Sequence, residues 1–298
     1  MAPSITGLTY GLLLLGALPR IITATPVAGL NVDSEVVGQV PLPNTPFEAA
    51  VEHDAVFVDT ESQSDEAADE SILAPSWWVS TLMARRLLAL STSGVVSTVF
   101  PDPLPPKSHA PAEVAGQSIS LKEYFADCDE ALPAGVGNGG DGSPTFLALY
   151  IATTFRNTAA GSNISLSIDW WDHLNNTKPV FPGFPLSPAG LPRVTLFGYI
   201  EPFETPVPQE TESALRSCYT QAHPDSQAWL PGRLGSPHGS YWAKMVVTQV
   251  YWIGGFGGFQ QIGWMNVTEW NGIRRMGSLP GIGDGRGWED VRLPGETE

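Results

Sequence analysis

The histidines and the carboxylates near them are the side chains of this sequence that could carry metal or acid–base chemistry. None of the histidines belongs to an H-x-x-x-H or H-E-x-x-H pattern, and no G-x-S-x-G occurs. Metalloprotease and α/β-hydrolase sites therefore lack the spacing on which their geometry depends. Asp169, Asp172 and His173 suggest metal ligands, but a strand that ends in a polar loop explains the same cluster. We predict no catalytic and no metal-ligating residue. The five histidines are His53, His109, His173, His223 and His238.

Two glycine-rich stretches have the composition of phosphate-binding loops. Residues 135–140 match G-x-G-x-x-G, a motif that binds a dinucleotide where a strand precedes it and a helix N-terminus follows. Here a strand-like segment, 146–151, follows instead. We therefore interpret 135–140 as a loop between strands, and 252–258 as a sharp turn between two strands.

The N-terminus has the pattern of a secretory signal. An uncharged run over 5–18 ends at Pro19-Arg20 and is followed by small residues. A run of this length is shorter than the about 20 apolar residues that span a bilayer. We interpret residues 1–24 as a cleaved signal peptide and expect no membrane span, so the mature chain is expected to be extracellular or vacuolar/lysosomal.

The secretory pathway is oxidising, which affects the expected state of the two cysteines, Cys128 and Cys218. Cysteines of secreted proteins usually pair, and a bridge over a loop of this length stabilises the folded state by roughly 4 to 5 kcal/mol in the chain-entropy model. The hypothesis of a disulfide stands beside the alternative of two separate buried thiols. Neither cysteine has a second Cys or a His at the spacing of a metal site.

Three N-x-S/T sequons are candidate glycosylation sites in a chain that enters the secretory pathway. They begin at Asn163, Asn175 and Asn266, and none has proline in the middle. Chance occurrence in a chain rich in Ser and Thr is the alternative explanation. Asn175 has the most polar, loop-like surroundings.

Charge divides the chain into zones. The net charge is −16, and residues 29–75 hold eleven acidic side chains without any Lys or Arg. Segment 25–75 is predicted to be disordered, either a solvated linker or a propeptide, and 273–298 to be a disordered tail. The region between, 76–272, has no cluster of basic residues, which excludes nucleic acid as a partner.

Within 76–272 the periodicity is mainly that of strands. Apolar residues at helical spacing over 79–90, behind a possible cap at Ser76, predict one helix, and 210–222 predict another. In 164–170 apolar residues alternate with Ser165, Ser167 and Asp169, as in a half-buried strand. Strands without a βαβ rhythm favour a mainly β (α+β) fold, an antiparallel barrel. The seven candidate strands are 95–100, 118–121, 146–151, 164–170, 194–200, 245–253 and 259–265.

Several short motifs in this region resemble those of the CREG family, secreted or lysosomal glycoproteins. They are ARRLL at 84–88, EYFADC at 123–128, IATTFRN at 151–157, AGSN at 160–163, HPD at 223–225, WLPG at 229–232, His238, YWAK at 241–244, VYWIGGFG at 250–257 and IGW at 262–264. The resemblance, to fungal members in particular, covers about 76–272. Neither the acidic segment nor the tail has a counterpart in the pattern.

The resemblance implies a six-stranded antiparallel split β-barrel with flanking helices, of the FMN-binding type typified by pyridoxamine-phosphate oxidase. It also implies a homodimer formed through barrel faces. Enzymes of that superfamily hold flavin mononucleotide (FMN) at the dimer interface, whereas CREG proteins are regarded as not binding flavin because a loop fills the pocket. They act by engaging protein or glycan receptors or lysosomal partners.

Two functional hypotheses follow. The first is a non-enzymatic, secreted or vacuolar glycoprotein with no cofactor. The second is an FMN- or haem-dependent oxidoreductase on the same barrel, since fold alone does not decide chemistry. Under the second, the phosphate would be held by Ser97 and Thr98 with Arg156 and Lys244, each of which borders a predicted strand. For Arg156 and Lys244 the ordinary alternative is a solvated head with an alkyl stem over apolar surface.

Overall fold

The computed structural model describes residues 74–297, apart from 134–135, 137–139, 181–182, 184, 257–258 and 274–290. The predicted signal peptide, nearly all of the acidic segment and most of the predicted tail therefore lie outside the described residues. Of the described helices, none is long and apolar enough to cross a membrane.

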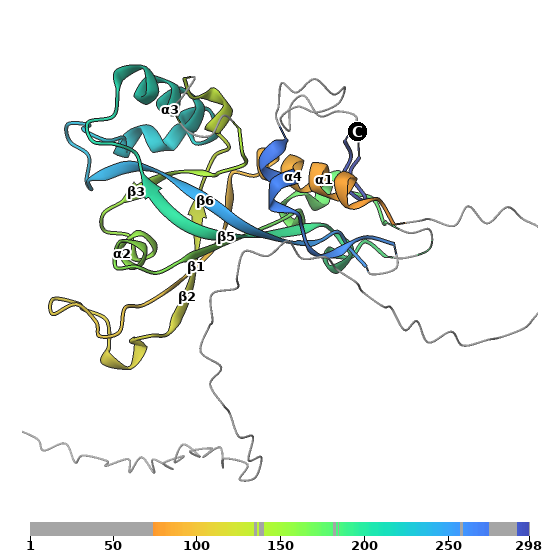
Figure 1. Ribbon diagram of the computed structural model, residues 1–298, viewed down its shortest axis with the longest axis horizontal. Coiled ribbons are helices and arrows are strands. Elements are labelled where there is room, and N and C mark those ends of the chain that lie inside the picture. Colours follow the sequence, from red (N-terminus) through yellow and green to blue (C-terminus); the bar gives the residue numbers. More distant parts are fainter. Residues whose placement is uncertain are drawn as a thin grey trace, which may run out of the picture. The chain divides into compact units, whose positions relative to one another are not determined.

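Six strands form one curled antiparallel sheet, a half-barrel with helices at its sides (Figure 1). Their order across the sheet is β2-β1-β4-β5-β6-β3, and a short seventh strand pairs with β6. The strands are β1 (Ser93–Val99), β2 (Ser118–Tyr124), β3 (Thr145–Leu149), β4 (Ile164–Asp169), β5 (Arg193–Pro202), β6 (Ser240–Ile253) and β7 (Ile262–Trp264). The predicted six-stranded antiparallel split barrel is confirmed, and each predicted strand overlaps an observed one.

The helices are α1 (Trp77–Leu90), α2 (Thr153–Ala159), α3 (Gln209–Ala222) and α4 (Val267–Gly272). Figure 1 shows α1 and α4 side by side at one end of the sheet and α3 at the other. The sequence predicted α1 and α3. It missed α2 and α4 because helices of six or seven residues are too short to show a period.

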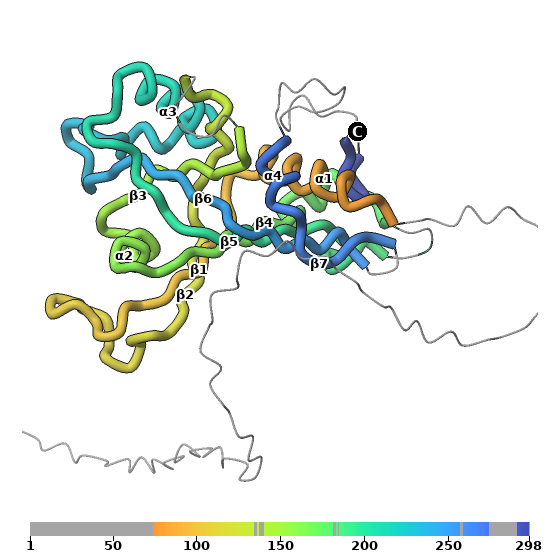
Figure 2. The backbone as a smooth tube through the Cα atoms, viewed as in Figure 1, coloured from red at the N-terminus to blue at the C-terminus, as the bar shows by residue number. Residues whose placement is uncertain are grey.

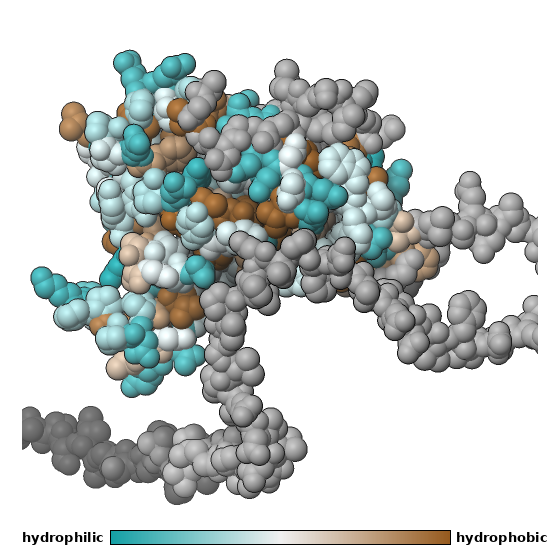
Figure 3. Space-filling model, in the orientation of Figure 1, coloured by the Kyte–Doolittle hydropathy of each residue, from teal (hydrophilic) through white to brown (hydrophobic). Residues whose placement is uncertain are grey.

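Two apolar clusters hold these elements together. The larger fills the concave side of the sheet and includes Leu87 and Leu88 of α1 together with Leu166 and Trp252. The smaller lies under α3, around Trp242 of β6. On the face drawn in Figure 3, hydrophobic residues also reach the surface over the strands, between the α3 end and the α1–α4 end.

Helix α1 carries two arginines into the interior. Arg85 is 2% exposed, and its guanidinium donates to the carbonyl oxygens of Trp270 (2.8 Å), Ile273 (3.1 Å) and Gly140 (3.1 Å). It also lies over the Trp270 ring, 5.2 Å from the centroid. Gly142, at φ +79°, has this guanidinium where its side chain would be, so only glycine fits. Arg85 thereby ties α1 to α4 and to the loop before β3.

Residues 291–297, which belong to the segment predicted to be a disordered tail, make specific contacts with the rest of the domain. Leu293 is 2% exposed, and the Glu296 carboxylate accepts from the buried Arg86 at 2.5 Å. The backbone N–H of Lys178 donates to the carbonyl of Gly295 (2.7 Å). Figure 2 shows this segment ending beside α1. The sequence did not predict this contact because the segment has few apolar residues and its partners Arg86 and Lys178 lie far away in the chain.

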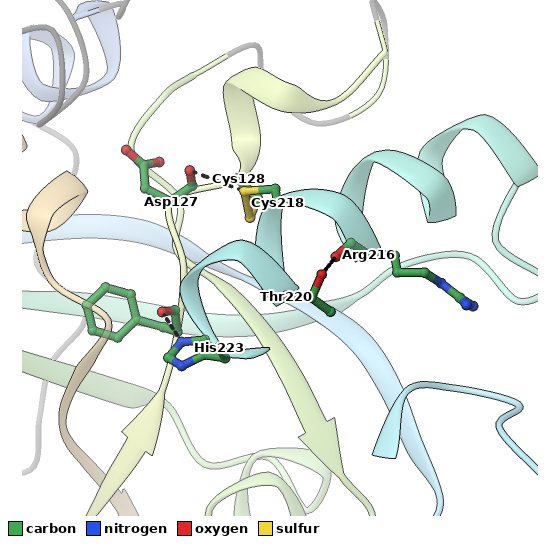
Figure 4. The surroundings of a disulfide bond; sticks show 7 residues. Asp127, Cys128, Arg216, Cys218, Thr220 and His223 are labelled. Carbon is green, nitrogen blue, oxygen red and sulfur yellow. Dashed lines mark hydrogen bonds between the residues drawn. A yellow bond between two sulfur atoms is a disulfide. The ribbon is translucent and has the colours of Figure 1, made fainter. Parts of the chain in front are cut away.

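The predicted disulfide is present in the structure. Cys128, just after β2, is bonded to Cys218 of α3, and the two are 90 positions apart in sequence (Figure 4). The same two segments are joined again where His223 Nε2 lies 2.9 Å from the carbonyl oxygen of Phe125. The bridge thus attaches α3 to the edge of the barrel.

We expect replacement of both cysteines, Cys128→Ser with Cys218→Ser, to lower the free energy of unfolding by up to roughly 4 kcal/mol, because the cross-link restricts a long loop of the unfolded chain. Chemical denaturation of the wild type with and without reductant provides the control. Reductant should lower the stability of the wild type to that of the double variant and leave the variant unchanged. A wild type that is indifferent to reductant would show that the bridge is absent from the purified protein.

Candidate functional site

The four residues proposed for a flavin phosphate do not converge. Ser97 and Thr98 are consecutive in β1, so they face opposite sides of the sheet. Thr98 is buried and accepts from Asn157 Nδ2 (3.0 Å), whereas Ser97 shares a hydrogen bond with Ser120 (2.8 Å). One hydroxyl is thus enclosed between β1 and α2, and the other is on the outer face.

The two cations of that set also lie apart. Arg156 is exposed on α2. The Lys244 ammonium, on β6, lies 3.4 Å from the Glu201 carboxylate of β5, and its side chain is 14% exposed. Strands β4 and β5 separate β6 from β1 in the sheet. A bound phosphate requires several donors aimed at one point, and these residues do not supply that arrangement.

The buried cations of α1 are engaged by the protein itself. Arg85 donates to three backbone carbonyls, and Arg86 is paired with Glu296. Releasing either to a ligand would leave buried polar groups without their partners, which is costly. These six residues therefore do not form a site for the phosphate of FMN, and we derive no step through a flavin.

A depression on the outer face of the sheet is the candidate site with a mixed polar and aromatic lining. Its volume is about 520 Å³, and it lies where β4 ends, β5 begins and β6 ends. Antiparallel pairing brings Asp169 opposite Arg193, and Ser167 opposite Thr195. Six of its lining residues carry polar or aromatic groups: Ser167, Asp169, Trp171, Arg193, Thr195 and Tyr251.

Hydrogen bonds fix several of these side chains. Asp169 Oδ1 accepts from the backbone N–H of Trp171 (2.8 Å), and the Trp171 indole N–H donates to the carbonyl of Pro188 (2.8 Å). Arg193 Nη1 donates to the carbonyl of Ala189 (3.3 Å). The hydroxyls of Ser167 and Thr195 are 3.0 Å apart. The depression thus presents a carboxylate, a guanidinium, two hydroxyls and aromatic rings in fixed positions.

The sequence did not identify this site because the register of the strands creates it. The alternation over 164–170 predicts Ser165, Ser167 and Asp169 on the polar side of a strand, and the structure confirms this. Arg193 is one of ten basic residues scattered over 76–272, and it lies 24 positions from its cross-strand partner Asp169. The alternating Ser and Asp residues, together with a Trp directly after the strand, were the available signal.

Asp169, Asp172 and His173, whose sequence pattern suggested metal ligands, make other contacts in the structure. Asp172 pairs with Lys122 at 3.2 Å, Asp169 binds the Trp171 backbone, and the His173 ring stacks on Trp170 at 4.0 Å. Across the part of the chain that the structure describes, no three His, Cys, Asp or Glu side chains gather in a way that could hold a metal ion.

All three sequon asparagines are exposed. Asn163 directly precedes β4, and Asn175 lies in the 3-10 segment Trp171–Asn176. Asn266 caps α4: its Oδ1 accepts from the N–H groups of Thr268 (2.8 Å) and Glu269 (3.4 Å). Because that cap uses the oxygen, the amide nitrogen to which a glycan attaches is left available.

Comparison with known proteins places this architecture in a family. The family model described as "CREG, beta-barrel" matches residues 75–271, about two thirds of the chain. This chain belongs to the CREG β-barrel family. The match has nearly the extent of the resemblance seen in the motifs, and a search of curated proteins returned no match.

Likenesses to solved structures are distant. They include a haem-binding protein from Mycobacterium smegmatis (TM-score 0.43, 18% identity, covering 67% of this chain and 61% of that one). A protein of unknown function from Agrobacterium tumefaciens has a TM-score of 0.37 at 17% identity, covering 62% of this chain and 60% of that one. An FAD-binding protein from Mesorhizobium loti has a TM-score of 0.34 at 14% identity, covering 57% and 90%. This chain thus spans about three fifths of the length of the first two proteins.

Two of the CREG motifs have clear structural roles here. Trp242 and Trp252, from the YWAK and VYWIGGFG motifs, are 2% and 0% exposed. Gly255 has φ +143° and lies against the carbonyl of Gly190, where a side chain has no room. Membership in the family therefore fixes the barrel, and the depression has to be judged by its own geometry.

Glu123, on strand β2, is a carboxylate in an unusual setting. It lies half-buried on β2 and accepts a hydrogen bond from the Thr154 hydroxyl of α2 (2.6 Å). Burial raises the pKa of Glu123 above its ordinary value of 4.5, and the Thr154 hydrogen bond opposes this to a smaller extent. The folded state thus binds this proton more tightly than the unfolded state does. Its contribution to stability is complete below about pH 4.5 and is lost as pH rises through the raised pKa.

We therefore expect Glu123→Gln to remove part of the loss of stability between acidic and neutral pH. Gln retains an acceptor for Thr154 and carries no charge, so the variant should gain stability relative to the wild type at pH 7 and little at pH 4. Thermal melting of both proteins from pH 4 to 7 measures this. Exposed Glu204→Gln is the matched control, and equal pH profiles for Glu123→Gln and the wild type would contradict the assignment.

Proposed function

We propose that this CREG-family chain is a secreted or vacuolar, non-enzymatic glycoprotein that binds its partners as a split-barrel dimer without a cofactor. The observation that carries the proposal is the placement of Ser97, Thr98, Arg156 and Lys244, which face different directions on different elements. The cations of the barrel interior are used to hold α1, α4 and the C-terminal segment together.

Passage through the secretory pathway is supported by three independent features. The N-terminal sequence has the pattern of a signal peptide. The chain contains a disulfide, which is typical of oxidising compartments. Asn163, Asn175 and Asn266 are exposed and accessible to glycosylation.

Dimerisation is supported by exposed apolar residues on the outer face of the sheet. Val95 and Val99 of β1 are 43% and 45% exposed, and Tyr199 of β5 is 47% exposed. They alternate with buried neighbours and so project from the convex side of the barrel. Exposed apolar residues grouped on a sheet are typical of a surface that another protein covers. A second copy of this chain is the occupant we propose for these residues.

The alternative is a flavin- or haem-dependent oxidoreductase. Proteins of similar fold are named as haem-binding, FAD-binding and F420 reductase proteins, which keeps a flavin as the cofactor to test. Under this alternative, donors other than the four predicted residues would have to bind the phosphate.

Titration of the purified mature protein with FMN distinguishes the two hypotheses. We expect no saturable change in flavin fluorescence, because no set of converging donors was found among Ser97, Thr98, Arg156 and Lys244. A known flavoprotein, stripped of its cofactor, verifies that the assay detects binding. Stoichiometric binding of FMN, or release of flavin or haem from the denatured protein, would overturn the proposal.

A lysine on the outer face should weaken the dimer. Tyr199→Lys puts a charge into the apolar surface, and we expect the dissociation constant to rise about tenfold or more, measured by analytical ultracentrifugation. Leu234→Lys, on a loop where Leu234 is 97% exposed, is the control and should leave assembly unchanged. A dimer that is unaffected by Tyr199→Lys, or a wild type that is monomeric throughout, would contradict this interface.

A further inference from the structure

We infer that the depression between the ends of β4, β5 and β6 is a carbohydrate-binding site that takes a single pyranose ring. The inference rests on the proposed function of a binding protein and names its ligand class. A volume of about 520 Å³ lies within the range of about 300 to 1,000 Å³ that small-molecule pockets occupy. Its lining combines the groups that a ring with hydroxyls on its rim and C–H bonds on its faces requires.

The charged residues supply directional hydrogen bonds. Asp169 and Arg193 are direct cross-strand partners on the same face, and among the described residues they form no ion pair with each other. One carboxylate oxygen is occupied by the Trp171 N–H, and one guanidinium nitrogen by the Ala189 carbonyl. The other carboxylate oxygen accepts and the remaining guanidinium N–H groups donate. Two neighbouring sugar hydroxyls match this pair, because each hydroxyl both donates and accepts.

The aromatic residues supply a flat apolar surface. Trp171 is 46% exposed, although a tryptophan of a folded domain is ordinarily well covered. Its indole N–H is bound to the Pro188 carbonyl, which fixes the ring in place beside the depression. Tyr251 contributes a second ring from β6. The face of a pyranose is lined by C–H bonds, and such a face stacks on an aromatic ring while its hydroxyls stay in contact with water.

The hydroxyls of Ser167 and Thr195 complete the polar lining. They are bonded to each other at 3.0 Å, and each retains capacity for a further hydrogen bond. They are paired residues on the same strands, β4 and β5, as Asp169 and Arg193. The four polar groups thus form a compact square on the sheet, with Trp171 and Tyr251 beside it.

Charge argues against an anion or an amino acid. A phosphate or carboxylate attracted to Arg193 would also be repelled by the carboxylate of Asp169, which lies directly opposite Arg193 on the neighbouring strand. The chain as a whole has a net charge of −16, which also disfavours anions. A zwitterion such as an amino acid could pair with both groups, but its charges are strongly hydrated in water. Because the site is open to solvent on its outer side, the ion pairs formed there are too weak to compensate for the hydration that the ligand loses. A neutral ring with many hydroxyls incurs the smallest desolvation cost.

The test uses the mature protein before and after enzymatic removal of its own N-linked glycans, since these could occupy the site. The probes are the methyl glycosides of glucose, mannose, galactose and N-acetylglucosamine, with glycine and inorganic phosphate as competing chemistries. Saturation-transfer NMR detects contact, and tryptophan fluorescence gives the affinity. We expect saturable binding of at least one glycoside and none of glycine or phosphate.

Substitutions in the depression test whether the sugar binds there. Trp171→Ala should weaken the affinity about tenfold or more. Asp169→Asn should do the same, because Asn keeps the acceptor for the Trp171 N–H and removes the charged oxygen. Arg193→Lys keeps the positive charge but has a single nitrogen in place of the guanidinium fork, so it should also weaken binding. It replaces Trp171→Ala as the test variant if Trp171→Ala melts at a lower temperature than the wild type. Trp78→Ala removes a tryptophan of similar exposure, 37%, from α1 and is the matched control.

The inference is overturned if no glycoside binds either form of the protein, if Trp171→Ala and Asp169→Asn bind as the wild type does, or if glycine or phosphate binds in place of sugar. These outcomes are separate from those of the FMN titration. A protein that binds neither flavin nor sugar contradicts the sugar site alone, whereas a protein that binds FMN contradicts the proposed function whatever its response to sugar.

Discussion

The buried guanidinium of Arg85 is the contact on which the rest of the domain depends. A cation in the interior is tolerable only where donors and acceptors satisfy it, and here three carbonyls from α4 and from the loop before β3 converge on it. That loop is held in turn by Asp129, whose carboxylate accepts from the backbone N–H of Asp141 (3.1 Å). Asp129 directly follows the disulfide residue Cys128, so α1, α3 and α4 are all tied to one short region beside β3.

This arrangement decides where ligand chemistry can lie. The concave side of the sheet is filled by α1 and the apolar cluster, and the cations nearest to it are committed to carbonyls and to Glu296. The convex side carries a polar and aromatic depression at one end, while exposed Val95 and Tyr199 project from the same side. Both the ligand site and the dimer contact that we propose therefore lie on the convex side, and the interior serves stability.

The sequence predicted those parts of the structure that depend on local pattern. The alternation over 164–170 gave both the strand β4 and its outward face, and the helical spacing over 79–90 gave α1. The burial of Arg85 and Arg86 was not predictable, because their partners Trp270 and Glu296 lie about 185 and 210 positions away. The candidate site has the same origin, since Asp169 meets Arg193 only through the register of β4 and β5. Contacts between distant segments carry no local signature.

The same distinction explains why family membership leaves the function open. Motifs such as YWAK and VYWIGGFG identify the family because tightly packed tryptophans and glycines with restricted backbone tolerate few substitutions. Side chains of the convex face are free of that constraint, because Ser167, Trp171 and Arg193 could be exchanged without opening the core. A barrel can thus keep its motifs while its ligand changes. The chemistry of this chain has to be inferred from the few fixed groups on its convex face, and Trp171, held over the depression by Pro188, is the most specific of them.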